Sequence, residues 1–383
     1  MTGVILINFG GPVPPKQGEG EPIELFLLDI LRDVLPCPLK PFAKIFARLR
    51  LPCAKKMYEA IGGTSPVVSW TMKQAQALEY RLNGHVGEGL CPLPELRAAT
   101  KGRPYKIHIG MKYGKPSIDN AIARAKSDGC EKIILLPLFP YRSKYTDLSL
   151  RLSAGFLAEG ARATKRSDAS DVILSEAKDP PRLVHWIDSL RPIERGCAHN
   201  DKPHPLYIRC MVDIIRSSLA DWRDIPPPQV TLLFTAHAIP IHAARIDPYL
   251  KQINESVCEI MKSFTGCNYQ IAFQSQSGPI RWTTPDVKTV INRLAHLSTY
   301  ALKHLLIIPL GFACENLETL YELDQLYLPF AKSLGLNVKR TPALNDNPIF
   351  IDLLAELVLS NRSSTLYLSA KAVVAEGAPI EFN

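Results

Sequence analysis

Short apolar runs rich in β-branched residues recur along the chain, and they constrain its fold more than any other feature. Most of them carry apolar residues at consecutive positions, so both faces of each predicted strand would be covered. Each run ends in glycine, proline or polar residues and is followed by a helical pattern. This order is typical of parallel sheets between helical layers, a doubly wound α/β architecture. The runs are residues 3–9, 105–111, 132–138, 229–235, 268–273 and 304–310.

The predicted strands divide into two groups, which indicates two similar lobes. One group precedes residue 140 and the other follows residue 228. The length of 383 residues is also more than one hydrophobic core usually organises. Residues 160–201 are polar and contain prolines, and we interpret them as an insertion or interdomain excursion. The expected division is an N-terminal α/β lobe at 1–155, the excursion at 156–203, a C-terminal α/β lobe at 204–345, and a C-terminal helix and tail at 346–383.

Composition argues against several classes of protein and leaves a membrane contact open. The net charge of +8 is modest and its basic residues are dispersed, which speaks against a nucleic-acid partner. Nine cysteines without a C-x-x-C pair favour reduced thiols and a cytoplasmic protein. We expect no membrane span and no signal peptide. The basic stretch 40–56 has two interpretations: an ordinary helix that faces the core, or an amphipathic surface on the anionic inner face of the membrane. The oligomeric state stays open.

The residues that follow each predicted strand are expected to carry the chemistry, because ligands of open parallel sheets bind beyond the carboxyl ends of the strands. These segments hold aromatic rings, a few cations, one histidine and an acidic segment. Together they would suit a large, flat, aromatic acid. They do not match a glycine-rich phosphate-binding loop. The segments begin at Phe9, Met111, Pro137, Thr235, Gln274 and Pro309.

Two features of these segments can be interpreted either as purely structural or as functional. Glu315, Glu318 and Glu322 would share one face of an α-helix at about 100° per residue. They form either a solvated stripe or a line of carboxylates that carries a divalent cation or protons inward. His237 is either a hydrogen-bonded structural group or a neutral imidazole that takes a proton or binds a metal ion.

Six motifs in order resemble the ferrochelatase family, and the resemblance extends from residue 4 to about residue 357. It implies a chelatase-like fold of two similar Rossmann-type lobes, each a parallel sheet flanked by helices, with a porphyrin in the cleft between them. It also implies an enzyme that inserts ferrous iron into protoporphyrin IX to form haem. The motifs are Leu6-Ile7-Asn8-Phe9-Gly10-Gly11-Pro12, Ile61-Gly62-Gly63-Thr64-Ser65-Pro66, Met111-Lys112-Tyr113-Gly114, Phe234-Thr235-Ala236-His237-Ala238-Ile239-Pro240, Phe273-Gln274-Ser275 and Leu317-Glu318-Thr319-Leu320-Tyr321-Glu322.

By this resemblance His237 and Glu318 face each other across the centre of the macrocycle, and Glu315 and Glu322 belong to an acidic path. Metal insertion needs a base for the pyrrole N–H protons and a transient ligand for iron(II), roles that suit His237 and Glu318 respectively. An incomplete set of protein ligands would allow the metal to leave. The expected contacts with the porphyrin are Phe9, Lys112, Tyr113, Tyr141, Arg142, Ser143, Ser277, Arg281 and Trp282.

The loop after the third strand departs from the family pattern, which usually reads Pro-Gln-Tyr-Ser where this chain has Pro140-Tyr141-Arg142-Ser143. This altered loop suggests one alternative, a non-catalytic protein that binds porphyrin or haem. Another alternative is a coproporphyrin III ferrochelatase or another tetrapyrrole chelatase, which depends on how many substrate carboxylates the rim can pair. Some family members carry an iron–sulfur cluster on cysteines near the C-terminus, but no cysteine follows Cys314. We therefore expect no such cluster, and no cofactor beyond the iron substrate.

Overall fold

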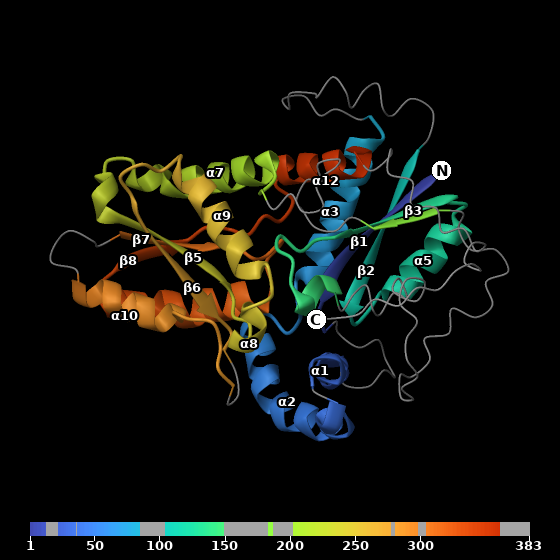
Figure 1. The fold of residues 1–383 in the computed structure, drawn as a ribbon, viewed down its shortest axis with the longest axis horizontal. Helices are drawn as coiled ribbons and strands as arrows, with labels where there is room; N and C mark the ends of the chain where they lie inside the picture. Colours follow the sequence, from blue (N-terminus) through green and yellow to red (C-terminus); the bar gives the residue numbers. More distant parts are fainter. Residues whose placement is uncertain are drawn as a thin grey trace, which may run out of the picture.

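Two parallel sheets organise the computed structural model, which describes residues 1–12, 22–35, 37–84, 104–148, 183–186, 202–276, 280–297 and 304–360. Their strand orders are β2-β1-β3-β4 and β6-β5-β7-β8, so both halves of the chain share one topology (Figure 1). The first sheet comprises β1 (Thr2–Gly10), β2 (Tyr105–Tyr113), β3 (Lys132–Pro137) and β4 (Leu183–Trp186). The second comprises β5 (Val230–His237), β6 (Asn268–Gln274), β7 (His304–Pro309) and β8 (Asn337–Arg340). The predicted architecture of two similar α/β lobes is confirmed.

Helices connect and cover these strands. The α-helices are α1 (Pro22–Val34), α2 (Ala43–Ala60), α3 (Val67–Leu82), α5 (Ile118–Ser127), α7 (Pro205–Leu219), α8 (Ile241–Ala244), α9 (Tyr249–Met261), α10 (Val287–Leu297), α11 (Leu328–Ser333) and α12 (Pro348–Ser360). The 3₁₀ segments are η1 (Cys37–Phe42), η3 (Ala220–Trp222) and η4 (Pro227–Gln229). Within the described residues, two segments are π-helices, η2 (Lys144–Leu148) and η5 (Glu318–Tyr327).

The consecutive apolar residues of β1 serve two different cores. Val4 and Leu6 pack into a large core that also contains residues of α3, while Ile5 and Ile7 pack on the opposite face against α5. All four side chains are fully buried. Alternate residues of a strand point to opposite faces, so a strand covered on both sides needs apolar residues at every position. This is the physical reason for the uninterrupted apolar runs in the sequence.

The larger core joins the two halves of the chain. It includes residues of β1 and β3 from the first sheet, β5 and β7 from the second, and the helices α3, α7, α9 and α12. Helix α12, the last element described, packs against both α3 and α7 (Figure 1). Polar contacts fix the same junction, because Gln74 of α3 donates to the carbonyls of Ala313 (3.0 Å) and Asn345 (2.8 Å). Arg81 of α3 forms an ion pair with Asp352 of α12 at 2.7 Å.

Two strands were not predicted from the sequence. Strand β4 lies within the predicted excursion 156–203 and pairs in parallel with β3, and β8 pairs in parallel with β7. Each contains four residues, too few for an alternating pattern to stand out. The six predicted strands are all present, within about two residues at their ends. The boundaries of the predicted domains stay predictions.

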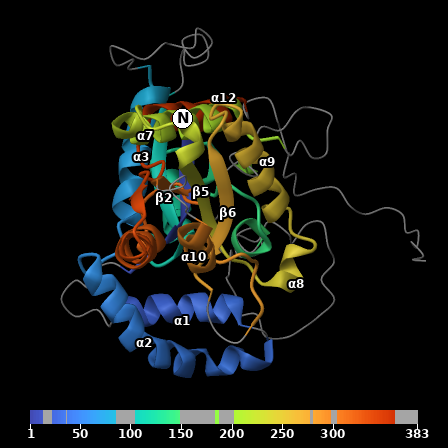
Figure 2. The ribbon, with the colours of Figure 1, turned by 90° about the vertical axis from the view of Figure 1, so that its left-hand side faces the viewer.

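Helices α1 and α2 form a pair at one end of the molecule, away from most of the other helices (Figure 2). Leu28 and Leu31 of α1 pack on Ala43 and Ala47 of α2. Across the described residues, we find no helix with both the length and the apolar character that crossing a membrane requires.

The junction between the halves can be tested at Gln74. The change Gln74→Ala removes two hydrogen bonds from a fully buried side chain. The Asn345 carbonyl loses this donor, while the Ala313 carbonyl still accepts from the backbone N–H of Asn345. We expect the free energy of unfolding to fall by about 2–4 kcal/mol, measured by urea denaturation. Gln76→Ala is the matched control, because Gln76 lies on the same helix and is exposed. Equal stabilities of the two variants would contradict the role of Gln74.

Candidate active site

His237 is the last residue of β5 and is held by two backbone contacts. Its Nδ1 atom lies 2.6 Å from the carbonyl oxygen of Ala238, and the hydroxyl of Tyr249 donates to the carbonyl of His237 at 3.0 Å. A carbonyl oxygen can only accept, so Nδ1 must carry the hydrogen in this contact. In the neutral imidazole Nε2 then keeps its lone pair, which makes it the atom that can accept a proton or bind a metal ion.

Gln274 connects the end of β5 to the acidic helix. It is the partner of His237 in the β5–β6 pairing, and its side chain is 1% exposed. Its Nε2 donates to the backbone carbonyl of Glu318 at 3.3 Å and to Oε2 of Glu322 at 3.1 Å. The hydroxyl of Ser275 donates to the same Oε2 at 2.8 Å. One amide therefore sets the position of η5 relative to the strand end that carries His237.

Ser275 has a backbone conformation that few residues other than glycine adopt. Its φ is 65°, in the left-handed region. Such strain persists where the surrounding structure requires it, and here it turns the Ser275 hydroxyl toward Glu322.

The predicted stripe of three carboxylates on one α-helical face is wrong. Residues 318–327 form a π-helix, with hydrogen bonds from i to i+5 instead of i to i+4. Glu315 precedes this helix, and its Oε1 accepts from Arg340 Nη1 and from the backbone N–H of Ala343, both at 2.9 Å. Arg340 also forms a two-pronged ion pair with Asp324 at 2.7 Å. Glu315 is therefore engaged in an ion pair with Arg340, and its place on the acidic path stays a prediction.

Glu318 and His237 both lie close enough to Glu322 for their charges to act on its carboxyl group. Burial raises the pKa of Glu318 even though the side chain keeps some contact with solvent. Burial and then the charge of Glu318 raise the pKa of Glu322, against the opposing effects of Ser275, His237 and Gln274. The charge of Glu318 also raises the pKa of Tyr58 of α2, after burial as the main cause. Two carboxyl groups in this situation favour a shared proton or a bound cation.

The predicted aromatic contacts of the first half form a cluster that reaches this pair. Phe9 packs on Tyr113 with ring centroids 4.9 Å apart, and both belong to a group that includes Tyr58 and Leu317. Leu317 directly precedes Glu318. Phe9 and Tyr113, at the ends of β1 and β2 of the first sheet, therefore lie near the start of η5, which follows β7 of the second sheet.

Lys112 is directed into the protein. Its side chain is 3% exposed, and its Nζ lies 3.0 Å from Asp33 Oδ2 and donates to the carbonyl of Tyr145 at 2.8 Å. Burial lowers the pKa of Lys112, partly offset by Asp33. The hydroxyl of Tyr113 donates to the same carboxylate at 2.5 Å. Because Lys112 already forms an ion pair with Asp33, its predicted contact with a substrate carboxylate stays a prediction.

The loop after β3 meets the loop after β5. Ser143 donates its hydroxyl to Asp247 at 3.0 Å, and the backbone N–H of Arg142 donates to Gln252 at 2.9 Å. Tyr141 is buried and packs edge-on against Tyr249, with ring centroids 6.0 Å apart. This loop therefore supports the segment that holds His237, and direct porphyrin contacts from Tyr141, Arg142 and Ser143 stay predictions.

The remaining predicted residues lie around residue 281. Trp282 is half-buried and forms a β-bridge with Pro240. The backbone carbonyl of Arg281 accepts a hydrogen bond from the backbone N–H of Ile241 at 2.9 Å. Both therefore lie beside the segment that follows His237. The Arg281 side chain is exposed. Ser277 lies outside the described residues.

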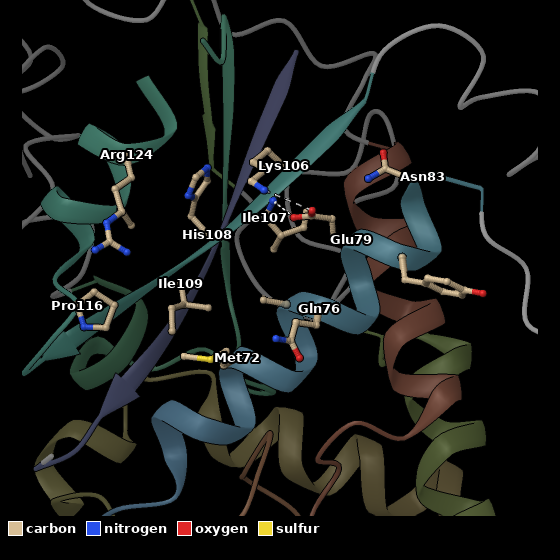
Figure 3. Close-up of a pocket in the computed structure, with 13 residues that line it drawn as sticks. Met72, Gln76, Glu79, Asn83, Lys106, Ile107, His108, Ile109, Pro116 and Arg124 are labelled. Carbon is tan, nitrogen blue, oxygen red and sulfur yellow. Dashed lines mark hydrogen bonds and ion pairs between the residues drawn. The ribbon is translucent and has the colours of Figure 1, made fainter. Parts of the chain in front are cut away.

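A cavity of about 720 Å³ lies elsewhere, between α3, β2 and α5. Figure 3 shows that Lys106 and Glu79 meet across its wall, where Glu79 also accepts from the backbone N–H of Ile107. None of the predicted site residues lines this cavity. It is therefore separate from the group formed by His237, Glu318 and Glu322.

Sequence reasoning assigned no role to Gln274, Tyr58 or Asp33. Gln274 could have been singled out by its place directly after a buried strand. Tyr58 and Asp33 carry no comparable signal, because their partners Glu318 and Tyr113 are distant in sequence.

The arrangement of two such lobes defines the chelatase fold. The structure of SirB from Bacillus subtilis with Fe3+ matches 94% of this chain and 96% of its own, with a TM-score of 0.50 and 9% sequence identity. The ferrochelatase family model matches residues 1–165 and 199–362, and the chain therefore belongs to the ferrochelatase family.

Curated relatives agree with this assignment. The ferrochelatase of Geotalea uraniireducens is 33% identical over 373 residues, covering 95% of this chain and 98% of the relative. The ferrochelatase of Aquifex aeolicus is 33% identical over 361 residues, covering 93% and 98%. The protein is thus an enzyme of haem biosynthesis that inserts a metal ion into a porphyrin.

The electrostatic pair can be tested through stability. Glu318→Gln removes a carboxyl whose pKa lies above its ordinary value of 4.5. When the pKa of a carboxyl is higher in the folded protein than in the unfolded one, its contribution to stability is fully present below the pKa of the unfolded state. That contribution is lost as the pH rises through the pKa of the folded state, where the buried carboxyl becomes charged. We therefore expect the variant to melt about 2 °C or more above the wild type at pH 7, on the order of 1 kcal/mol, since remaining solvent contact screens the charge.

The gain should shrink as pH falls toward 4.5, measured by thermal denaturation across the pH range. Glu131→Gln, at an exposed position, is the control and should leave the melting temperature unchanged at each pH. A gain that persists at pH 4, or no gain at pH 7, would contradict the assigned electrostatics.

Proposed function

We propose that the enzyme inserts iron(II) into protoporphyrin IX and so forms haem, the last step of haem biosynthesis, in the cytoplasm. The observation that carries the proposal is the combination at the end of β5. His237 has its Nδ1 hydrogen committed to Ala238, and it lies close enough to Glu322 for a positive charge on the imidazole to lower the pKa of that carboxyl, which the charge of Glu318 raises. A proton acceptor and a pair of carboxyl groups that favours a cation are the two components that metal insertion requires.

In this mechanism Nε2 of His237 accepts the pyrrole protons, one after the other, as the metal enters the ring. Glu318 attracts the ferrous ion, because a divalent cation relieves the cost of a buried carboxylate beside a second one. The protons pass from His237 to Glu322, whose carboxylate interacts with both His237 and Glu318. Few protein ligands on the metal allow its transfer to the ring nitrogens. The proposal requires no cofactor besides the iron substrate and no iron–sulfur cluster.

The choice of porphyrin rests on the cations at the predicted contacts. Coproporphyrin III carries more carboxylates than protoporphyrin IX, and each needs a cation or a hydrogen-bond donor. Lys112, one of the predicted partners, is already paired with Asp33. This pairing favours the substrate with fewer carboxylates. Coproporphyrin III remains the alternative substrate, and a porphyrin-binding protein without catalysis is the alternative function.

The catalytic assignment can be tested with His237→Ala. We expect its rate of metal insertion to fall at least about 100-fold, the usual contribution of a general base. The measurement is the anaerobic loss of protoporphyrin fluorescence with iron(II). His242→Ala is the control, because His242 is an exposed histidine on α8. A rate for His237→Ala equal to that of the wild type would exclude this mechanism.

The substrate can be tested by comparing two porphyrins on the wild type under the same anaerobic conditions. We expect kcat/KM for protoporphyrin IX to exceed that for coproporphyrin III at least about tenfold, because unpaired substrate carboxylates would be desolvated at the rim. The reverse preference would assign the coproporphyrin activity. Tight binding of both porphyrins without turnover would instead support the non-catalytic alternative.

A further inference from the structure

The cavity beside β2 lies at the open edge of the first sheet. Among the described strands, β2 pairs with β1 alone, and residues on its other edge line the cavity of about 720 Å³. Helices α3 and α5 pack on opposite faces of this sheet, and each contributes one wall (Figure 3). A volume of this size is usual for a small-molecule pocket. The cavity therefore wraps around a sheet edge, between two helices.

Side chains of α3 cap the first half of this edge. The amide of Asn83 donates to the carbonyl of Tyr105 at 3.0 Å and accepts from its N–H at 2.9 Å. Glu79 accepts from the N–H of Ile107 at 2.8 Å. Caps of this kind keep another strand from pairing with an edge. An extended peptide could not pair along β2 without breaking these contacts, which favours a small molecule as the occupant.

One backbone donor of the edge is left open to the cavity. The N–H groups of successive residues in a strand point to its two sides in turn. Those of Tyr105, Ile107 and Met111 all point outward, the last to the carbonyl of Pro116 at 2.7 Å. The N–H of Ile109 therefore points outward as well, and within the described part of the chain no side chain or loop caps it. It can donate to a ligand.

One half of the cavity is apolar. Ile107 and Ile109 direct their side chains to the face of the sheet that packs on α3. Met72 and Tyr80 of α3 line the same half and are 48% and 53% exposed. Large apolar side chains exposed beside a cavity are a usual feature of ligand sites. This half would accept the apolar body of a ligand.

The other half of the cavity is basic. Lys106 and His108 alternate with the two isoleucines, so they face α5, whose Arg124 also lines the cavity. Arg124 is exposed and forms no ion pair or hydrogen bond with another described residue. Burial lowers the pKa of His108, and the charges of Lys106 and Arg124 lower it further, against the opposing charge of Asp128. The three basic side chains are therefore close enough for their charges to act on one another.

The acidic neighbours of this half leave room for an anion. Glu79 lies 3.7 Å from Nζ of Lys106, and Asp128 lies 3.6 Å from Nε2 of His108. Both separations exceed the length of a hydrogen bond. Figure 3 places Glu79 and Arg124 on opposite sides of β2, so the carboxylate of Glu79 does not neutralise Arg124. Lys106 and Arg124 therefore keep donors that an anion could occupy.

We propose that this cavity binds a small organic anion, with its apolar body on Met72 and Ile109 and its phosphate or carboxylate group at Arg124 and Lys106. A guanidinium group can hold either anion through two parallel hydrogen bonds. An apolar surface alone would suit a neutral molecule, and cations alone would suit inorganic phosphate. The two halves side by side favour a ligand that carries both features. The inference does not rest on the function proposed above, because none of the predicted site residues lines the cavity.

Calorimetric titration of the full chain with phenyl phosphate tests the proposal. We expect its dissociation constant to lie at least about tenfold below those of inorganic phosphate and of phenol, because only phenyl phosphate fills both halves. Arg124→Gln and Met72→Ser should each weaken its binding at least about tenfold. Both side chains are exposed, so the melting temperature should stay unchanged. Benzoate, titrated in parallel, distinguishes a carboxylate site from a phosphate site, and tight binding of either compound supports the proposal.

The matched control is Arg223→Gln, which removes an arginine that is 83% exposed and far from the cavity in sequence. It should bind phenyl phosphate like the wild type, and Arg124→Gln should keep the wild-type rate of metal insertion. Equal binding of phenyl phosphate by Arg124→Gln and the wild type would overturn the proposal. So would equal affinities for phenyl phosphate and inorganic phosphate, or displacement of phenyl phosphate by protoporphyrin, which would assign its binding to the porphyrin site.

Discussion

The amide of Gln274 is the contact on which the site depends. It belongs to β6, next to His237 in the sheet, and it holds both the backbone of Glu318 and the carboxylate of Glu322. Helix η5 otherwise follows β7 through the segment 310–317 and could adopt other angles to the sheet. A buried amide that lost these partners would leave donors unsatisfied, which is costly in a low-dielectric interior. The imidazole and the two carboxyl groups are therefore kept together by a neutral residue that takes no part in the chemistry.

The large shared core gives this contact a rigid frame. The same face of each sheet contributes to that core, and α12 packs across the junction onto α3 and α7. Asn8, near the end of β1, donates to Thr71 of α3 at 2.9 Å and lies 3.6 Å from the Sγ atom of Cys314. The carboxyl ends of β1 and β7 thus meet in the interior, although they belong to different sheets. This explains how aromatic residues at the ends of β1 and β2 reach the segment that begins η5.

The sequence predicts the parts of this architecture that depend on local patterns. Strands buried on both faces need uninterrupted apolar residues, so β1, β3, β5 and β7 were recognisable, and the strand ends pointed to His237. Strands β4 and β8 are edge strands of four residues and carry too little pattern. The π-helix was not predicted, because the spacing of Glu315, Glu318 and Glu322 fits one face of an ordinary α-helix. Glu315 precedes the π-helix and pairs with Arg340, a partner distant in sequence that no local pattern indicates.

The same limit applies to Lys112, whose partner Asp33 lies on α1, far away in the sequence. The most direct test of the account is a crystal structure of the enzyme with metal-free protoporphyrin bound. We expect the centre of the macrocycle to lie between Nε2 of His237 and the carboxylate of Glu318, with Phe9 and Trp282 near its rim. A porphyrin bound elsewhere, for example in the cavity beside β2, or a histidine directed away from the ring nitrogens, would contradict it.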